Sequence, residues 1–339
     1  MKVPIINQDS PSGDYIPPST FPIGPFTKYP GNPILTPDPN VEFECAYLYN
    51  ATAIVVSNRV FLLYRAQNRA KTSSIGIAWS DDGIHFEKFN RPILSPTEWY
   101  ENGGGVEDPR IVRDPESKKF IMTYTAYDRY KARLCIATSE DLFTWKKYPP
   151  FISSNWHDIT YNSFGEQSIR QEWTKSGAIF TERNQDGKYY MIWGDSELYL
   201  AESPDLIHWN LPSYSLINNR FAKLGVFPHE SKLIESGPAP IKMSNGQYIL
   251  IYNASTIGDG HLPRETYSIS QMLIDYNKIK QGPIARLENP IIVPEANNEN
   301  QGQVNKVVFC EGLVQFKNQW LLYYGQGDSE LGVAIAPIT

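Results

Sequence analysis

Short apolar and aromatic runs alternate with polar turn residues along most of this chain. Typical runs are rich in Tyr, Ile and Val and bounded by Gly, Asn, Asp or Pro, and they span residues 52–66, 118–127, 188–194, 247–254 and 319–327. Runs of this kind are strand signals. No amphipathic helix pattern longer than about three turns separates them. The pattern therefore predicts an all-β protein.

An internal repeat groups these strands. Segments 76–89, 135–148 and 199–212 share one template, in which Ala-x-Ser leads into an Asp turn and an aromatic residue follows four positions after the Asp. The template serine recurs after 59 and then 64 residues, and a weaker copy lies at 331–337. Units of about 60 residues with several strands each suit the blades of a propeller. A chain of 339 residues has room for about five such units, so we predict a five-bladed β-propeller.

The repeated turn itself is expected to be structural. Asp82-Gly83 suits a tight hairpin, because Gly adopts positive φ without steric cost. The aromatic residue that follows, Phe86 in the first copy, is expected to pack between neighbouring sheets. We therefore assign these segments to blade geometry and look elsewhere for chemistry.

The N-terminal segment differs in composition from the rest of the chain. Residues 1–30 belong to a stretch rich in Pro, Gly and Ser, which predicts an extended arm. Residues 31–339 show no further break in composition, and we predict that they form a single catalytic propeller domain. A chain of this length is able to bury a large core.

The charge and the aromatic content of the chain limit the classes of ligand that it is expected to bind. With 31 basic and 37 acidic residues the net charge is −6, and no run of Lys and Arg suited to a phosphate backbone occurs. We therefore expect no nucleic-acid partner. Aromatic residues make up 13% of the chain, including 21 Tyr and 8 Trp. This content suits strand faces and, as an alternative, stacking on sugar rings.

The cysteines and the start of the chain bear on location. Cys45, Cys135 and Cys310 have no metal-binding or redox spacing, so we expect reduced thiols. The first residues lack the apolar core of a signal peptide, and no stretch approaches the ~20 apolar residues of a membrane span. We expect a cytoplasmic protein with no membrane partner, or a periplasmic one if a leader has been removed. Assembly into a homo-oligomer is an alternative that the sequence leaves open.

Carboxylates interrupt the strand pattern at three places. Glu107 and Asp108 are adjacent, so on a strand only one would face a central cavity, while the other pairs with Arg110 or caps a turn. Glu235 ends an apolar pair just before a Gly-Pro bend, and it either projects from a sheet end into a site or lies in solvent. Glu311 lies inside an apolar run, where Glu is rare, and is either a paired buried residue or a functional one.

Two basic residues accompany these carboxylates. Arg65 ends an apolar strand and Lys175 opens an apolar run. Such groups hold carboxylates ionised, bind phosphate or simply lie at the surface. The five histidines have no zinc-binding spacing, and nucleophile-elbow, Walker and dinucleotide motifs are absent. These exclusions leave carboxylate chemistry without a metal or organic cofactor, and the aromatic-rich propeller favours a sugar substrate.

At these segments the chain resembles glycoside hydrolase family 130, the mannoside phosphorylases and their β-mannosidase relatives. The match runs from about residue 30 to the C-terminus and rests on NPIL, LLYRA, SDDGIHF, GVEDPRI, KSGAI, LIESGPAP, VVFCEGLV and YYGQGDSELGVA. The family fold is a five-bladed β-propeller. The resemblance implies that Asp108 of the DPR motif is the proton donor of the phosphorylases. It also implies that Arg65, Lys175 and Asp328 contact substrate or phosphate.

Two positions depart from the phosphorylase pattern. Trp193-Gly194 replaces an Arg-Pro, and Asn253 replaces the His of a Tyr-His-Gly. Loss of these two charged donors would weaken a dianion site by several kcal/mol, at roughly 1.5–3 kcal/mol for each charged hydrogen bond. In this respect the chain is similar to the branch that hydrolyses β-1,2-mannosides, in which glutamates replace the phosphate ligands. The resemblance implies Glu235 as one of these glutamates and either Glu265 or Glu311 as the other.

The sequence therefore predicts an inverting β-mannosidase, exo-acting on β-1,2-linked mannooligosaccharides. One carboxylic acid protonates the leaving oxygen while a second carboxylate activates water. The expected catalytic residues are Glu235, Glu265 and Asp108. The expected substrate-binding residues are Arg65, Glu107, Lys175, Asn50, Tyr267, Glu311 and Asp328.

Two alternatives stay open. The first is a mannoside phosphorylase that uses inorganic phosphate as co-substrate and forms mannose 1-phosphate. Arg65, Lys175 and a cytoplasmic location favour it. The second is a non-catalytic sugar-binding propeller, which would lack a pair of opposed carboxylates in its cavity.

Overall fold

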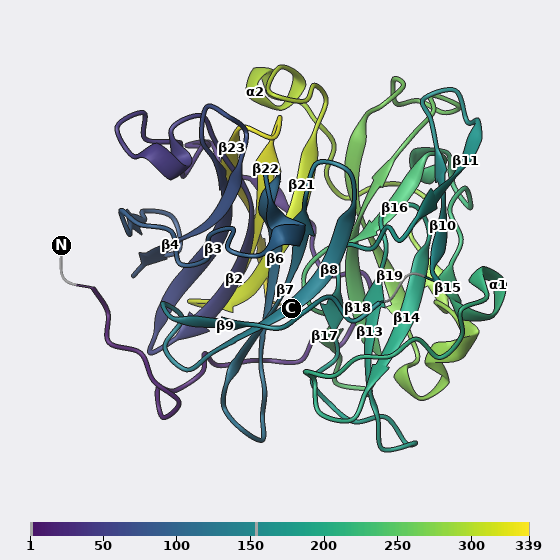
Figure 1. The fold of residues 1–339 in the computed structure, drawn as a ribbon, viewed down its shortest axis with the longest axis horizontal. Coiled ribbons are helices and arrows are strands. Elements are labelled where there is room, and N and C mark those ends of the chain that lie inside the picture. The colour runs from purple at the N-terminus through teal and green to yellow at the C-terminus, as the bar shows by residue number, and fades with distance from the viewer. Residues whose placement is uncertain (1–2, 153–154, 339) are drawn as a thin grey trace.

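The computed structural model describes residues 3–152 and 155–338, and the fold is all-β. Helical segments are short: α1 spans Leu216–Asn219, α2 spans Asn297–Asn300, and 3₁₀ turns span Glu42–Glu44, Trp99–Glu101, Pro228–Glu230 and Tyr276–Gln281. Among the described residues, none of the helices has the length and apolar character that crossing a membrane requires. The strands carry the architecture, and they form antiparallel units that follow one another along the chain (Figure 1).

The first two units share one sheet. Their strands are β2 (Tyr47–Val56), β3 (Arg59–Gln67), β4 (Ser73–Ser80), β5 (Glu87–Lys88), β6 (Gly105–Arg113), β7 (Phe120–Tyr127), β8 (Ala132–Ser139) and β9 (Trp145–Lys147). All neighbours pair antiparallel except β4 and β6, which are joined in parallel by the Ser73–Gly105 pair. The sheet therefore divides at this junction into two antiparallel units of four strands.

Three further units complete the chain. The third consists of β12 (Ala178–Ile179), β13 (Tyr189–Trp193), β14 (Leu198–Ser203) and β15 (Arg220–Ala222). The fourth consists of β16 (Leu233–Ser236), β17 (Ile241–Lys242), β18 (Tyr248–Ser255), β19 (Tyr267–Ile274) and β20 (Ala285–Arg286). The fifth consists of β21 (Val308–Phe316), β22 (Gln319–Gln326), β23 (Glu330–Pro337) and β1 (Thr27–Lys28). A separate hairpin of β10 (His157–Tyr161) and β11 (Gln167–Gln171) precedes the third unit.

An apolar core fills the space between each unit and the next. Phe61 and Phe120 belong to the core between the first and second units, and Met191 packs between the second and third. Tyr252 lies between the third and fourth units, and Trp320 between the fourth and fifth. A further core joins the fifth unit to the first. Because many strands are covered on both faces, as β4 is along its whole length, they read as continuous apolar runs in the sequence.

The repeated Asp turns have one structure. In the first, the hydroxyl of Ser80 accepts a hydrogen bond from the Gly83 amide at 2.8 Å, and Asp82 accepts bonds from the next two amides at 2.8 Å each. The copies after β8 and β14 repeat the aspartate contacts, and the ring of Phe86 packs edge-on against Tyr323 at 5.9 Å. The turns therefore serve packing between units, as the sequence predicts.

The N-terminal segment lies across several units. Gly13 donates its amide to the Val55 carbonyl at 3.0 Å, and the amide group of Gln315 exchanges two 2.7 Å hydrogen bonds with the backbone of Ile16. Further along, β1 pairs with β23 and thus adds an N-terminal strand to the C-terminal unit. These contacts tie the two ends of the chain to each other.

Candidate active site

Three β-bulges place polar side chains at the centre of the molecule. The register of β2, β6 and β21 shifts at Asn50, Asp108 and Glu311, respectively. Asn50 and Asp108 also have positive φ, of 46° and 52°, which is unfavourable outside glycine and recurs at functional sites. A bulge redirects a side chain from the normal alternation of a strand. The bulged residues from separate units thereby meet, and Asn50 Nδ2 donates to Asp108 Oδ1 at 3.0 Å.

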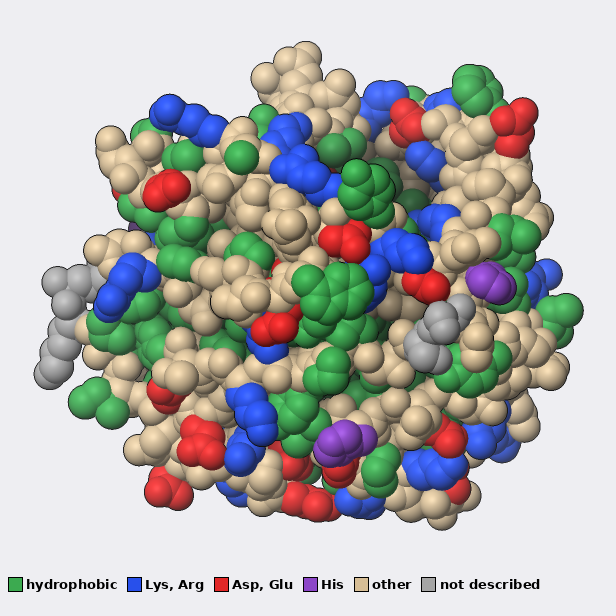
Figure 2. Space-filling model, viewed as in Figure 1, with side chains coloured by type: hydrophobic (Ala, Val, Ile, Leu, Met, Phe, Trp, Pro, Cys, Tyr) green, Lys and Arg blue, Asp and Glu red, His purple; other side chains and the backbone are tan. Residues whose placement is uncertain are grey.

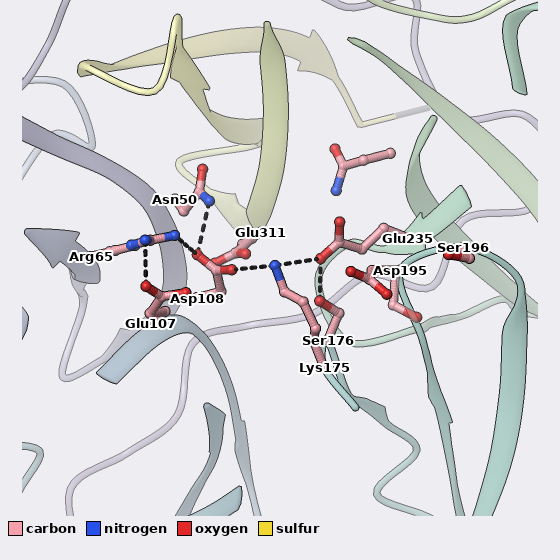
Figure 3. Close-up of polar contacts among 12 residues, drawn as sticks. Asn50, Arg65, Glu107, Asp108, Lys175, Ser176, Asp195, Ser196, Glu235 and Glu311 are labelled. Atoms are coloured by element: carbon pink, nitrogen blue, oxygen red, sulfur yellow. Dashed lines mark hydrogen bonds and ion pairs between the residues drawn. The ribbon is translucent and has the colours of Figure 1, made fainter. Parts of the chain in front are cut away.

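Asp108 is contacted by an amide group and two cations (Figure 3). Besides the Asn50 amide, Arg65 Nη1 lies 3.1 Å from its Oδ1 and Lys175 Nζ lies 3.0 Å from its Oδ2. Burial acts to raise the pKa of Asp108, but the charges of Lys175 and Arg65 outweigh it and hold that pKa well below the usual range. Asp108 is therefore an ionised carboxylate at neutral pH.

The neighbouring Glu107 contacts the same guanidinium group. Arg65 Nη2 lies 2.6 Å from Glu107 Oε1, so both adjacent carboxylates meet Arg65. The expectation that one of them faces a central cavity while the other pairs with Arg110 or caps a turn is wrong in its partner, because both carboxylates meet Arg65 where the bulge interrupts the alternation of β6. Arg110 instead donates to the backbone carbonyls of Ser236 at 2.7 Å and Gly237 at 3.0 Å.

Glu235 enters the same group from the end of β16. It accepts a hydrogen bond from the Ser176 hydroxyl, and its Oε1 lies 3.6 Å from Lys175 Nζ and 3.9 Å from Arg110 Nη2. Burial raises the pKa of Glu235, and the negative charge of Asp195 adds to this effect against the opposing charge of Lys175. Glu235 is therefore a buried carboxyl group that tends to keep its proton.

Glu311 is the most deeply buried carboxyl group at this centre, with 0% of its side chain exposed. Its Oε1 lies 3.2 Å from Arg110 Nη2, yet no hydrogen bond from the described residues reaches either oxygen. Burial raises its pKa well above the ordinary value. Because one guanidinium contacts both Glu311 and Glu235, the two carboxyl groups lie close together. We call the whole group the Asp108 cluster: Asn50, Arg65, Glu107, Asp108, Arg110, Lys175, Ser176, Glu235 and Glu311.

Two further expected residues border the cluster. Asp328 has a φ of 52°, and burial raises its pKa to about 6 against the opposing charge of Arg65. Tyr267 begins β19, and burial together with the charge of Glu235 raises the pKa of its phenol. The surface between the regions of β21 and β16 is hollowed, and Lys, Arg, Asp and Glu side chains gather at its rim (Figure 2).

Glu265 lies elsewhere. Its side chain is 52% exposed in the loop between β18 and β19, where Lys232 Nζ lies 3.1 Å from its Oε1 and the Ser163 hydroxyl donates to the same oxygen. These hydrogen bonds, first from Ser163 and then from Lys232, lower its pKa. Neither partner belongs to the Asp108 cluster, so the structure brings Glu311, and not Glu265, beside Glu235.

Sequence reasoning missed an acidic neighbour of Glu235. Asp195 follows β13 and lies beside Glu235 in Figure 3. Arg170 Nη2 and Nη1 contact its two oxygens at 2.5 and 3.1 Å, and Trp173 Nε1 donates to it at 3.0 Å. An acidic residue just beyond an apolar strand and a glycine was a usable signal for Asp195. Arg170 gave no signal, because it lies in a polar hairpin and reaches the site only through folding.

The two positions that depart from the phosphorylase pattern are part of the packed structure. Trp193 is buried against Trp156, with ring centroids 4.9 Å apart. Asn253 Nδ2 donates to the Cys310 carbonyl at 2.9 Å, and the Cys310 amide donates to Asn253 Oδ1 at 2.7 Å. The side chains at these positions are therefore neutral and engaged in packing or backbone contacts.

The charges of the cluster are less negative than its composition suggests. Arg65, Arg110 and Lys175 supply three cations, and four carboxyl groups contact them. Burial favours the protonated forms of Glu235 and Glu311, whereas Asp108 is held ionised. The arrangement therefore combines carboxyl groups of raised pKa, an ionised carboxylate and positive charge in one buried place. Across residues 3–152 and 155–338, no three His, Cys, Asp or Glu side chains are grouped to hold a metal ion.

Comparisons with known proteins place this geometry in a family. The model of glycoside hydrolase family 130, described as β-1,4-mannooligosaccharide phosphorylase, matches residues 27–339. A β-1,2-mannobiose phosphorylase from Thermoanaerobacter sp. (strain X514) is 31% identical over 91% of this chain and 96% of its own. A 1,2-β-oligomannan phosphorylase from the same organism is 30% identical over 89% of this chain and 94% of its own.

Solved structures agree with this placement. A putative glycoside hydrolase from Bacteroides ovatus has a TM-score of 0.80 and 34% identity, covering 93% of this chain and 96% of its own. A second structure comes from work on the GH130 family of mannoside phosphorylases, which contains glycoside hydrolases that target β-1,2-mannosidic linkages in Candida mannan. It has a TM-score of 0.76 and 30% identity over 94% of this chain and 96% of its own. The resemblance drawn from the motifs is confirmed, and the chain belongs to glycoside hydrolase family 130.

Proposed function

We propose that this protein cleaves β-1,2-linked mannosides by inverting transfer of a mannosyl group to inorganic phosphate, releasing mannose 1-phosphate. The observation that carries the proposal is the convergence of Arg65, Lys175 and Arg110 on four carboxyl groups, of which three, Glu107, Glu235 and Glu311, have raised pKa values. Such a cluster leaves positive charge for an anionic co-substrate. The named relatives are phosphorylases, and they support phosphate as acceptor better than the water that the sequence led us to expect.

Glu235 is the proposed proton donor, in place of Asp108, to which the resemblance assigns this role in the phosphorylases but whose pKa is held low. It is buried and its pKa is raised, which is what an acid acting near neutral pH requires. It would protonate the leaving glycosidic oxygen while a phosphate oxygen attacks the anomeric carbon from the opposite face. Phosphate is already an anionic nucleophile, so this reaction needs one acid and no general base. Asp108, held ionised, would accept hydrogen bonds from sugar hydroxyl groups and stabilise positive charge on the ring in the transition state.

The scaffold of this site is proposed to be a five-bladed propeller. Five antiparallel units follow one another, and an apolar core lies between each consecutive pair, including the last and the first. Val55, Ile111, Ile179, Ile241 and Leu313, one from each unit, line a common cavity of ≈ 420 Å³. These contacts support a closed ring of blades around a channel, with the cluster on its inner strands.

Hydrolysis is the second candidate, and a specific observation favours it. Each of the three cations already contacts a carboxylate, and Trp193 and Asn253 stand where the phosphorylase pattern has Arg and His. An inverting hydrolase would need a second carboxylate as base. Glu311 lies beside Glu235, although its burial favours the protonated form.

Four carboxyl groups in one cluster argue against the third alternative, a non-catalytic sugar-binding protein. Cytoplasmic location and a homo-oligomeric state stay predictions.

The acceptor is tested by incubating the purified protein with β-1,2-mannobiose, with and without inorganic phosphate. We expect mannose and mannose 1-phosphate in equal amounts, with turnover only when phosphate is present. Release of two mannose molecules at a rate independent of phosphate would instead establish hydrolysis. Absence of cleavage under both conditions, on this sugar and on longer β-1,2-mannosides, would overturn both candidates.

A further inference from the structure

The tip of the β10–β11 hairpin is a rigid turn. Asn162 Oδ1 accepts hydrogen bonds from the backbone amides of Phe164 at 2.9 Å and Glu166 at 3.0 Å, and its Nδ2 donates to the Glu166 carboxylate at 2.6 Å. Gly165 adopts a φ of +80°, which a glycine tolerates without strain. The backbone that carries Phe164 is therefore fixed by local hydrogen bonds.

The tip is fastened to the loop between β18 and β19. The Ser163 hydroxyl donates to Glu265, and Glu265 also pairs with Lys232 at 3.1 Å. The guanidinium carbon of Arg264 lies 4.5 Å from the centroid of the Phe164 ring, a cation–π contact. Lys232 directly precedes β16, the strand that contains Glu235. The tip of the hairpin is thus fixed next to elements that carry the Asp108 cluster.

The base of the hairpin is anchored beside the Asp108 cluster, at Asp195. Arg170 in β11 contacts Asp195, which lies beside Glu235, and it also contacts Asp158 in β10 at 2.6 Å and the Ser196 hydroxyl at 2.9 Å. The hairpin therefore runs from Asp195 to the loop that leads into Tyr267. Its base therefore lies on the Glu235 side of the site, and its tip lies at the loop between β18 and β19.

At this place an aromatic ring is left in solvent. Phe164 is 71% exposed, although its backbone is fixed and Arg264 covers one face of its ring. A fixed ring with a free face presents a flat apolar surface. The carbon-bound hydrogens of a pyranose ring form a matching apolar face, and aromatic contacts of this kind add affinity at little entropic cost when the ring is already held.

We propose that Phe164 is a binding platform for a distal mannosyl unit, so that the enzyme favours oligosaccharides longer than the disaccharide. This inference rests on the proposed function, and it adds a specificity residue remote from bond cleavage. The disaccharide would occupy the places on either side of the cleaved bond at the Asp108 cluster. Only a longer chain would extend along the hairpin to its tip.

The test compares kcat/KM for β-1,2-mannobiose and β-1,2-mannotetraose in the wild type, Phe164→Ala, Phe164→Tyr and Ile169→Ala. Ile169 is the matched control, since it is 69% exposed on the same hairpin but offers no ring. We expect Phe164→Ala to lower kcat/KM for the tetrasaccharide by about 3- to 10-fold through KM, the range of an aromatic contact, and to leave the disaccharide unchanged. Phe164→Tyr and Ile169→Ala should behave as wild type on both sugars.

Equal effects of Phe164→Ala on both sugars, or no effect on either, would overturn the inference. If the wild type cleaves neither sugar, the proposed function fails separately. Binding of mannotetraose followed by calorimetry then tests the platform without catalysis. Weaker binding by Phe164→Ala than by Ile169→Ala would support it, and equal affinities would refute it.

Discussion

Replacement of Glu235 by Gln is the sharpest test of the proposed acid. Gln keeps the shape of the side chain and still accepts the hydrogen bond from Ser176, but it has no proton to transfer. Lys175 keeps its 3.0 Å contact with Asp108, and Arg110 keeps its contacts with backbone carbonyls. The substitution therefore removes the chemistry and leaves the architecture of the cluster in place.

The expected loss is about 10²- to 10⁴-fold in kcat, the usual contribution of general acid catalysis, which equals about 3–5.5 kcal/mol of activation free energy. Stability should not fall with it. Because folding raises the pKa of Glu235, its contribution to stability is fully present below the ordinary pKa and is lost as pH rises through the raised value. Gln does not ionise, so the variant should be at least as stable as wild type at alkaline pH.

The assay is release of mannose from β-1,2-mannobiose in the presence of phosphate, together with thermal unfolding. Glu265→Gln is the matched control, since Glu265 is an exposed glutamate whose contacts, Ser163 and Lys232, lie outside the cluster. It should keep wild-type turnover on the disaccharide. Near wild-type turnover of Glu235→Gln would refute the assignment of Glu235 as the proton donor. A large loss in Glu265→Gln alone would instead identify Glu265, in the loop between β18 and β19, as the donor.

Two further outcomes follow from the cluster. Asp195→Asn removes a negative charge that raises the pKa of Glu235. The alkaline limb of the pH–rate profile, where Glu235 loses its proton, should therefore move to lower pH. An unmoved limb would contradict the proposed effect of Asp195 on the pKa of Glu235. Arg110→Met strips the carbonyls of Ser236 and Gly237 of their donor and removes the cation that pairs with the buried Glu311. Denaturant titration should show a loss of about 3–5 kcal/mol in unfolding free energy, and an unchanged midpoint would show that Arg110 is not structural.

Much of the fold could be predicted because the sequence contains an internal repeat. The Asp turns recur with the same hydrogen bonds, and the continuous apolar runs correspond to strands covered on both faces. Asp108, Arg65, Lys175 and Glu235 could also be picked out, since each interrupts, ends or opens an apolar run. The contact of both Glu107 and Asp108 with the guanidinium group of Arg65 could not be predicted, because the alternation of side chains along a strand gives no signal for a bulge.

The rest of the site depends on contacts between distant segments. Glu265 lies in a loop whose path is set by Ser163 of the β10–β11 hairpin and by Lys232, and its sequence position alone could not place it. Arg170 reaches Asp195 only because that hairpin folds back onto the third unit. Glu311 could be recognised as unusual, but its pairing with Arg110 depends on two strands from different units.

The central claim is that this site transfers mannose from a β-mannoside to phosphate with inversion. It is tested most directly by following β-1,2-mannobiose and inorganic phosphate with the enzyme by proton and phosphorus NMR from the first minutes of reaction. The account predicts that α-mannose 1-phosphate and one equivalent of mannose appear together as the first products. First-formed mannose from both sugar units, with no phosphate ester, would contradict it.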